Sequence, residues 1–199
     1  MKTRKQLRKH ISEDKYLVVP GAFDALTARL IELAGFDALY LTGGGFSRAN
    51  GYPDMGLMTM LEVTHWVGLV CDAVNIPVIA DADSGYGNAI NIVRTVREFE
   101  KTGVSAIHLE DQFAPKKCGH YEGKEIVAPE EMAGKIKAAV DTRRDEDFVI
   151  IARTDAIAVE GFESAIDRMN LYLESGADVG FVEAPQNREQ LESIPSKIN

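Results

Sequence analysis

The chain alternates short, continuously apolar runs with amphipathic segments of helical period, and this alternation restricts the folds open to it. A strand that is apolar at every position is buried on both faces, which is typical of a parallel sheet covered by helices. The alternation therefore predicts an α/β fold. The runs expected to form strands are "YLVVPG" (16–21), "DALYLTG" (37–43), "IPVIADAD" (76–83), "SAIHLED" (105–111), "FVIIARTD" (148–155) and "DVGFVEA" (178–184).

The segments between these runs carry helix signals. In the first of them Asp24 is a suitable N-cap, Leu26, Leu30 and Leu33 share an apolar face, and Gly35 is a C-terminal stop. Cys71 also lies in an apolar helical pattern, where a buried thiol is expected. The other segments predicted to be helices are 89–103, 129–140 and 163–176.

A repeat of glycines indicates how the units are connected. Gly35, Gly103 and Gly176 each stand shortly before a strand and are 68 and 73 residues apart, so a strand-helix unit takes about 35 residues. This spacing favours a (β/α)8 TIM-barrel type of fold. A doubly wound open sheet stays possible, although its dinucleotide-binding glycine fingerprint is absent after the first strand. Because a full barrel takes about 250 residues, residues 1–199 are expected to form one barrel domain truncated after about six units.

The charge balance disfavours two classes of binding partner. With 22 basic and 31 acidic side chains the net charge is −9, which disfavours binding to nucleic acid or to an anionic membrane. No run of about 18 apolar residues exists, and the basic start "MKTRKQLRKH" is not followed by the apolar core of a signal peptide. The two cysteines do not form a disulfide framework. A cytoplasmic protein is expected.

Polar side chains gather where the predicted strands end. The active site of a barrel is built at this edge, so these side chains are expected to lie together. A single acidic residue after a strand often only caps the next helix, but five strand ends carry polar groups here. They are Tyr40 and Thr42, Asp81 and Asp83, Glu110 and Asp111, Arg153 and Asp155, and Glu183.

The "DAD" triplet is the candidate metal site. In an extended segment Asp81 and Asp83 point to the same face, and Mg²⁺ prefers one or two carboxylates, waters and substrate oxygens. Glu110 would support the ion through water. Mn²⁺ and simple helix capping are the alternatives at this point.

Two features could bind a carboxylate substrate. Backbone amides of the "TGGGFS" stretch, around Thr42, Gly43 and Gly44, could approach an anion, although a flexible turn is the alternative. Arg153 could clamp a carboxylate with its guanidinium, although structural pairing with Glu183 or Asp155 is equally compatible with the sequence.

A long segment, 111–128, has no clear helix or strand pattern, and loops of this length at a barrel rim are often lids. Gly119 and Gly123 are possible hinges. Cys118 stands between Lys116, Lys117 and His120, whose charges would favour its thiolate and make it a proton donor or acceptor. Incidental placement of the cysteine is the alternative.

The ordered motifs "LYLTGGG", "DADSGYG", "HLEDQ", "PKKCGH" and "IIARTDA" resemble the isocitrate lyase and phosphoenolpyruvate mutase superfamily. The resemblance is strongest to the branch of methylisocitrate lyase, dimethylmalate lyase and oxaloacetate hydrolase. It implies Mg²⁺-dependent carbon-carbon cleavage of a 2-hydroxy dicarboxylate or tricarboxylate, giving a 2-oxo acid such as pyruvate and a second carboxylate. It also implies a tetramer.

The resemblance assigns roles to particular residues. Asp81, Asp83 and Glu110 would hold Mg²⁺, and Cys118 would protonate the product with His120 beside it. Substrate-binding roles fall to Thr42, Gly43, Gly44, Asp54, Arg153 and Glu183, with Arg153 polarising the carbonyl and Tyr40 assisting deprotonation of the hydroxyl.

The sequence departs from the superfamily pattern at Tyr121, where methylisocitrate lyases tend to have arginine. The departure therefore favours a smaller alkylmalate or oxaloacetate-like substrate over a tricarboxylate. Phosphonate chemistry, as in the mutases that generally lack the cysteine motif, and an inactive truncated remnant are the remaining alternatives.

Overall fold

The computed structural model describes residues 2–13 and 16–198 and contains one sheet of six parallel strands. Neighbouring strands pair in chain order, so every connection leads to the adjacent strand, as in a TIM barrel. Within the described residues β1 and β6 do not pair, and the sheet is open between them. The strands are β1 (Gly21–Ala22), β2 (Leu39–Leu41), β3 (Val78–Asp81), β4 (Ala106–Glu110), β5 (Val149–Thr154) and β6 (Val179–Val182).

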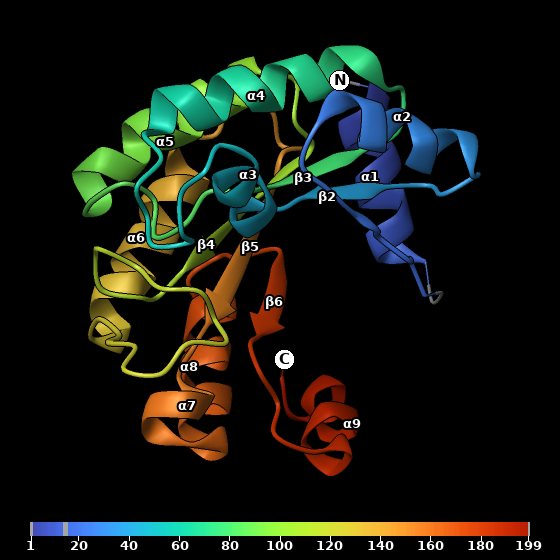
Figure 1. The fold of residues 1–199 in the computed structure, drawn as a ribbon. Helices are drawn as coiled ribbons and strands as arrows, with labels where there is room; N and C mark the ends of the chain where they lie inside the picture. The colour runs from blue at the N-terminus through green and yellow to red at the C-terminus, as the bar shows by residue number, and fades with distance from the viewer. Residues whose placement is uncertain (1, 14–15, 199) are drawn as a thin grey trace.

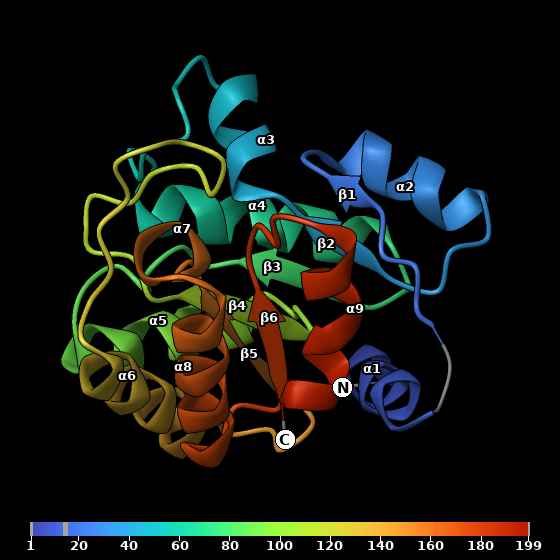
Figure 2. The same cartoon turned by 90° about the horizontal axis from the view of Figure 1, so that it is seen from below.

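Helices follow the strands and cover the outer side of the sheet. Successive helices α2, α4, α5, α6 and α8 contact one another around this side, as Figure 2 shows. The predicted barrel-type architecture is thereby confirmed over six units. The helices are α1 (Lys2–Ser12), α2 (Ala25–Leu33), α3 (Gly43–Ala49), α4 (Met60–Ala73), α5 (Ala89–Lys101), α6 (Pro129–Thr142), α7 (Ile157–Glu160), α8 (Phe162–Glu174) and α9 (Arg188–Lys197).

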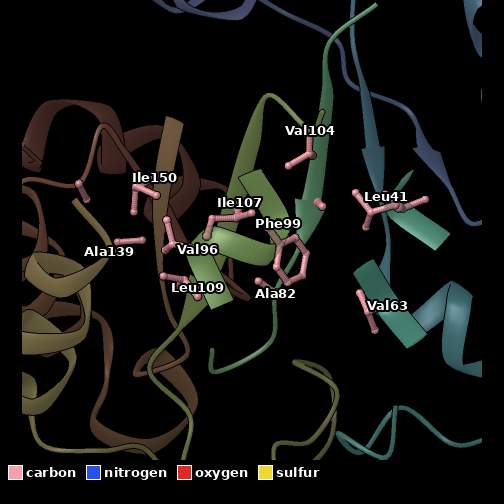
Figure 3. Packing of buried hydrophobic residues seen from close by; sticks show 14 of the residues in the cluster. Leu41, Val63, Ala82, Val96, Phe99, Val104, Ile107, Leu109, Ala139 and Ile150 are labelled. Carbon is pink, nitrogen blue, oxygen red and sulfur yellow. The ribbon is translucent and has the colours of Figure 1, made fainter. Parts of the chain in front are cut away.

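The main core lies between the sheet and the helices. Figure 3 shows Val96 and Phe99 of α5 beside Ile107 and Leu109 of β4, all of them at most 1% exposed. Fully burying a side chain of this size contributes about 1.5–3 kcal/mol. The alternate residues of the strands face the inner side of the sheet, where they are available for a site.

The amino-terminal helix closes the inner side at the amino ends of the strands. Leu7 packs there with Ala106, Val149 and Ile151. The buried Arg4 donates from Nε to the Val104 carbonyl oxygen at 2.9 Å. The basic start of the chain is thus a packed helix, and the carboxyl ends of the strands stay free for chemistry.

Two sequence-based expectations differ from the structure. The first strand was expected at 16–21 and lies at Gly21–Ala22. The leucine face of α2 is also not the packed one: Leu26, Leu30 and Leu33 are 70%, 57% and 77% exposed, and the helix buries Ala28 and Ile31 instead. The side of α2 that meets β1 and α4 accommodates these residues. No helix in 2–13 or 16–198 has the length and apolar character needed to cross a membrane.

Candidate active site

A cavity of about 580 Å³ opens at the carboxyl ends of the strands, and it collects the predicted site residues. Four of them do not line it: Gly43 and Asp83 lie beside it next to Asp81, Asp155 lies behind Arg153, and Asp111 is bonded to Thr154 and Tyr172. The cavity walls also contain Arg48 and His108, which the sequence did not single out for this site, and Lys116, which was expected beside Cys118. The predicted residues in the lining are Tyr40, Thr42, Gly44, Asp54, Asp81, Glu110, Cys118, His120, Arg153 and Glu183.

The two aspartates of the "DAD" triplet are held by a turn. Asp81 ends β3, but Asp83 has φ 49°, so the expectation of an extended pair is wrong. The Asp83 N–H donates to Asp81 Oδ1 at 3.0 Å, which keeps the two carboxylates adjacent. Burial and the charge of Asp81 raise the pKa of Asp83 to about 6. Burial would also raise the pKa of Asp81, but the hydrogen bond and charge of His108 outweigh it and lower that pKa.

Glu110, at the end of β4, contributes a third carboxylate. We call Asp81, Asp83 and Glu110 the acidic cluster. Glu110 is 1% exposed, and burial raises its pKa well above the usual range. Its Oε1 has no hydrogen-bond partner in the part of the chain that the structure describes. A buried carboxylate oxygen without a partner lowers the stability of the fold unless a cation or a hydrogen-bond donor contacts it.

These carboxylates fit a hard divalent cation that keeps water or substrate ligands. The described residues include no group of three or more His, Cys, Asp or Glu side chains arranged to enclose a metal by themselves. Mg²⁺ does not need such a group, since one or two carboxylates suffice when waters and substrate oxygens complete its octahedron. Asp81 and Asp83 could hold the ion, with Glu110 Oε1 accepting from a bound water.

Lys116 reaches from the loop 112–127 into the acidic cluster. Its Nζ lies 2.6 Å from Asp54 Oδ1 and 2.8 Å from Asp83 Oδ1, and the side chain is 6% exposed. Burial would lower the pKa of Lys116, but the charges of Asp83 and its acidic neighbours outweigh burial and raise it. Lys116 therefore stays charged and links the loop to the strand ends.

Arg153 at the end of β5 is paired with protein carboxylates. Its Nε and Nη2 donate to the two oxygens of Asp155 at 2.8 and 3.0 Å, and Glu183 Oε2 lies 3.5 Å from Nη2. Lys124 of the loop also pairs with Asp155, at 3.1 Å. Structural pairing, which the sequence left open, is thus present and aims the guanidinium along the cavity wall.

Tyr40 on β2 presents its phenol to the same space. Its hydroxyl lies 3.4 Å from His108 Nδ1. Burial, followed by the charge of Asp81, raises the pKa of Tyr40 well above its usual value. The resting side chain is consequently a neutral phenol that can donate a hydrogen bond.

The glycine cluster begins helix α3, so the alternative of a flexible turn is excluded. Thr42 is the N-cap, and its Oγ1 accepts from the Gly45 N–H at 3.3 Å. The N–H groups of Gly43 and Gly44, in the first turn, have no acceptor within the helix. A Cβ on Gly43 would lie 2.8 Å from Asp81 Oδ2, so a larger residue would displace the carboxylate.

Residues 112–127 form an irregular loop, as predicted (Figure 1). Four residues of this loop, Lys116, Cys118, Gly119 and His120, line the cavity. A single antiparallel bridge between Gln112 and Ile126 closes its base. Gly119 lies so close to Arg153 and Glu183 that a Cβ would stand 2.5 Å from Glu183 Oε1. We call residues 112–127 the lid.

Cys118 on the lid lines the cavity, but its surroundings differ from the expectation. Lys116 points to the aspartates and Lys117 donates to the Gly123 carbonyl oxygen, so the lysines do not surround the thiol as predicted. The neighbouring groups are His120, whose Nδ1 is 4.0 Å from the Cys118 sulfur, and Arg48 of α3.

The sequence matches the model of the family described as phosphoenolpyruvate phosphomutase over residues 7–199. The chain belongs to this family. With relatives named 2,3-dimethylmalate lyase and 2-methylisocitrate lyase, it lies in the isocitrate lyase and phosphoenolpyruvate mutase superfamily, so the predicted resemblance is confirmed.

Three similar proteins show which members of this superfamily the chain resembles. The chain is 52% identical to 2,3-dimethylmalate lyase of Eubacterium barkeri, over 100% of this chain and 69% of that protein. It is 46% identical to 2-methylisocitrate lyase of Aeropyrum pernix, over 96% of this chain and 62% of that protein. A solved phosphonopyruvate hydrolase in complex with oxalate and Mg²⁺ superposes with a TM-score of 0.91 at 34% identity, covering 98% of this chain and 68% of that one. This chain thus spans about two thirds of each relative.

Proposed function

We propose that the protein is a Mg²⁺-dependent carbon-carbon lyase that cleaves a 2-hydroxy dicarboxylate or tricarboxylate to a 2-oxo acid and a second carboxylate. The observation that carries the proposal is the position of Cys118, on a lid that lines the same cavity as Asp81 and Glu110. The relatives named dimethylmalate lyase and methylisocitrate lyase support this class of substrate.

The reaction requires a proton acceptor and a proton donor. As the hydroxyl loses its proton, its oxygen forms a carbonyl and the bond from the hydroxyl carbon to the next carbon breaks. The bonding electrons pass to that second carbon, next to a carboxylate, as an enolate that must gain a proton. Cys118 supplies this proton, and His120 at 4.0 Å is positioned to return one to the thiolate.

Tyr40 takes part in removing the hydroxyl proton. Because it is a neutral phenol at rest, it can accept that proton only while passing its own to His108, 3.4 Å away. This relay starts from neutral His108 with an unprotonated Nδ1, and the protonated ring that results is the form whose hydrogen bond and charge act on Asp81, 3.5 Å from Nδ1. Arg153, oriented by Asp155, stabilises the oxygen on which the carbonyl forms.

The first carboxylate of the substrate is placed at the start of α3, against Thr42 and the free N–H groups of Gly43 and Gly44. Asp81, Asp83 and Glu110 would hold Mg²⁺, which would supply positive charge to this first carboxylate and to the oxygen on which the carbonyl forms. Asp54 and Glu183 fix Lys116 and Arg153 around this space.

The test is release of a 2-oxo acid from 2,3-dimethylmalate, 2-methylmalate and 2-methylisocitrate, with and without Mg²⁺. Wild-type protein is expected to be active only with the metal. Cys118→Ser should lose about 100-fold or more in kcat and still bind oxalate. Cys71→Ser is the matched control, because burial raises the pKa of the Cys71 thiol to about 12 and the residue lies on α4, outside the cavity.

Phosphonate chemistry is the second candidate, favoured by the similarity to phosphonopyruvate hydrolase. In this chemistry the phosphorus–carbon bond breaks, and the pyruvate enolate that hydrolysis leaves takes its proton from water and not from the thiol. Turnover of phosphonopyruvate that is unchanged in Cys118→Ser would therefore replace the lyase proposal. Light scattering of the same preparations tests the prediction of a homotetramer.

A further inference from the structure

We propose that Arg48 binds the substrate carboxylate farthest from Asp81 and Asp83, and thereby makes the site selective for acids with a second carboxylate. This inference rests on the proposed function, because it names the group that recognises the far end of the same substrate. It concerns a residue that the sequence patterns did not indicate.

The first step is the distribution of positive charge in the cavity. Among the cationic side chains that line it, Lys116 is paired with two carboxylates and Arg153 with three. His120 lies 4.0 Å from Glu183. Of the described carboxylates none forms an ion pair with Arg48. Arg48 thus has its full charge available for an anionic ligand.

The second step is the position of Arg48. It lies in the last turn of α3, the helix whose first turn is assigned to the other carboxylate. The Arg48 Nη1 lies beside Gly44: a Cβ added to this glycine would be only 3.2 Å from Nη1. The absence of a side chain at Gly44 lets the guanidinium lie against the cavity wall.

The third step is the contact between Arg48 and the lid. Arg48 lies close enough to the side chains of Tyr121 and Cys118 for their interaction with its guanidinium to raise its pKa. Tyr121 is 44% exposed, so the pair lies at the mouth of the cavity. A ligand anion held by Arg48 would therefore lie next to the proposed proton donor, on the carboxylate side of the carbon that Cys118 protonates.

Direct binding in the presence of Mg²⁺ tests the role of Arg48 in the full chain. Calorimetry is run with oxalate, which is short enough to occupy only the metal end, and with 2-methylmalate, whose second carboxylate extends farther. Arg48→Gln should weaken the binding of 2-methylmalate about five- to tenfold, as expected for a charge-assisted contact screened by solvent. The affinity for oxalate should stay unchanged. Arg48→Lys should lose less, because it keeps the charge but not the planar guanidinium.

The matched control is Arg97→Gln, since Arg97 is an exposed arginine on α5 away from the cavity. This substitution should change the affinity for neither ligand. Equal weakening of oxalate and 2-methylmalate by Arg48→Gln, no weakening at all, or failure of the wild type to bind 2-methylmalate would each overturn the inference. Binding is read independently of turnover, so an inactive wild type that shows the selective loss would refute the lyase proposal and retain this one.

Discussion

The ammonium of Lys116 lies 2.8 Å from a carboxylate oxygen of Asp83, so a residue of the lid neutralises the acidic cluster at the strand ends. The lysine is 6% exposed and Asp83 is 15% exposed, which places the pair in a weakly screened environment. The position of the lid and the charge of the cluster are consequently coupled. A bound divalent cation would neutralise the same carboxylates.

Replacement of Lys116 by Met tests this coupling. The variant leaves Asp54 and Asp83 buried without their cation, so the free energy of unfolding in the absence of metal should fall by about 3–5 kcal/mol. Mg²⁺ should restore more stability to the variant than it adds to the wild type. Urea unfolding with and without Mg²⁺ measures both effects.

Lys137→Met is the control for this experiment. Lys137 is 71% exposed and pairs with Asp141, 62% exposed, on α6, so its loss should change stability by less than about 0.5 kcal/mol. Similar losses in the two variants would mean that the Lys116 pair contributes no more than a surface ion pair.

A second prediction concerns Lys124, which attaches the lid to the end of β5. Its Nζ donates to Asp155 and to the Gly119 carbonyl oxygen, and the residue is buried. Lys124→Met should loosen the lid, so amide hydrogens of residues 112–127 should exchange about tenfold faster. Lys117→Met is the control on the same lid, because the Lys117 side chain donates at the surface to the Gly123 carbonyl oxygen, and its bonds to Gln112 are made by the backbone, which Met retains. Unchanged exchange in Lys124→Met would show that the lid is held by other contacts.

The sequence predicted the fold well where the pattern follows from burial. Strands β3 to β6 lie within the predicted runs, and β3, β4 and β5 are largely buried because helices cover their outer side. At the edge strand β6 the run is apolar but Phe181 is 43% exposed. The first strand and the packed face of α2 were wrong because both depend on which neighbour the segment meets. Periodicity alone contains no information about that neighbour.

The site could be predicted as a set of strand ends but not as a network. Parallel strands bring their carboxyl ends together, which is why Asp81, Glu110 and Arg153 face one cavity. Arg48 was missed because the glycines before it suggested a loop, whereas they begin a helix that places Arg48 one turn further on. Only the folded lid determines that Lys116 turns toward Asp83 and not toward Cys118.

The third prediction uses pH to test the anchoring of helix α1. Arg4 Nη1 donates to Asp145 Oδ2 at 2.9 Å. Burial would raise the pKa of Asp145, but its hydrogen bonds, among them those from Arg4 and from the Asp147 N–H, outweigh burial and lower the pKa to about 2. The folded pKa is below the unfolded value of about 3.9, so this stabilisation is present above about pH 4 and is lost as pH falls toward 2.

Unfolding in urea at several pH values compares the wild type with Asp145→Asn. The difference in unfolding free energy should be greatest near neutral pH and should shrink below about pH 4. A difference that stays constant over this range would assign the effect of the substitution to something other than the ionised carboxylate.

The fourth prediction compares two glycines that occupy different surroundings. At Gly119 a Cβ would overlap Arg153 and lie 2.5 Å from Glu183 Oε1, so Ala must push the lid away from the ends of β5 and β6. Lyase activity should fall about 100-fold, because a displacement of about 1 Å at a reacting group can have this effect. The loss should appear mainly in kcat, since Cys118 is the adjacent residue.

Gly134→Ala carries the same chemical change without the contact. Gly134 lies in α6 with no atom within 4 Å of an added Cβ, so Ala should stabilise the chain by roughly 0.5–1 kcal/mol and leave activity unchanged. Steady-state kinetics and thermal unfolding of the two variants separate the effects. Full activity in Gly119→Ala would show that contact of the Gly119 backbone with Arg153 and Glu183 is not needed for turnover, and the lid would then act from a more open position.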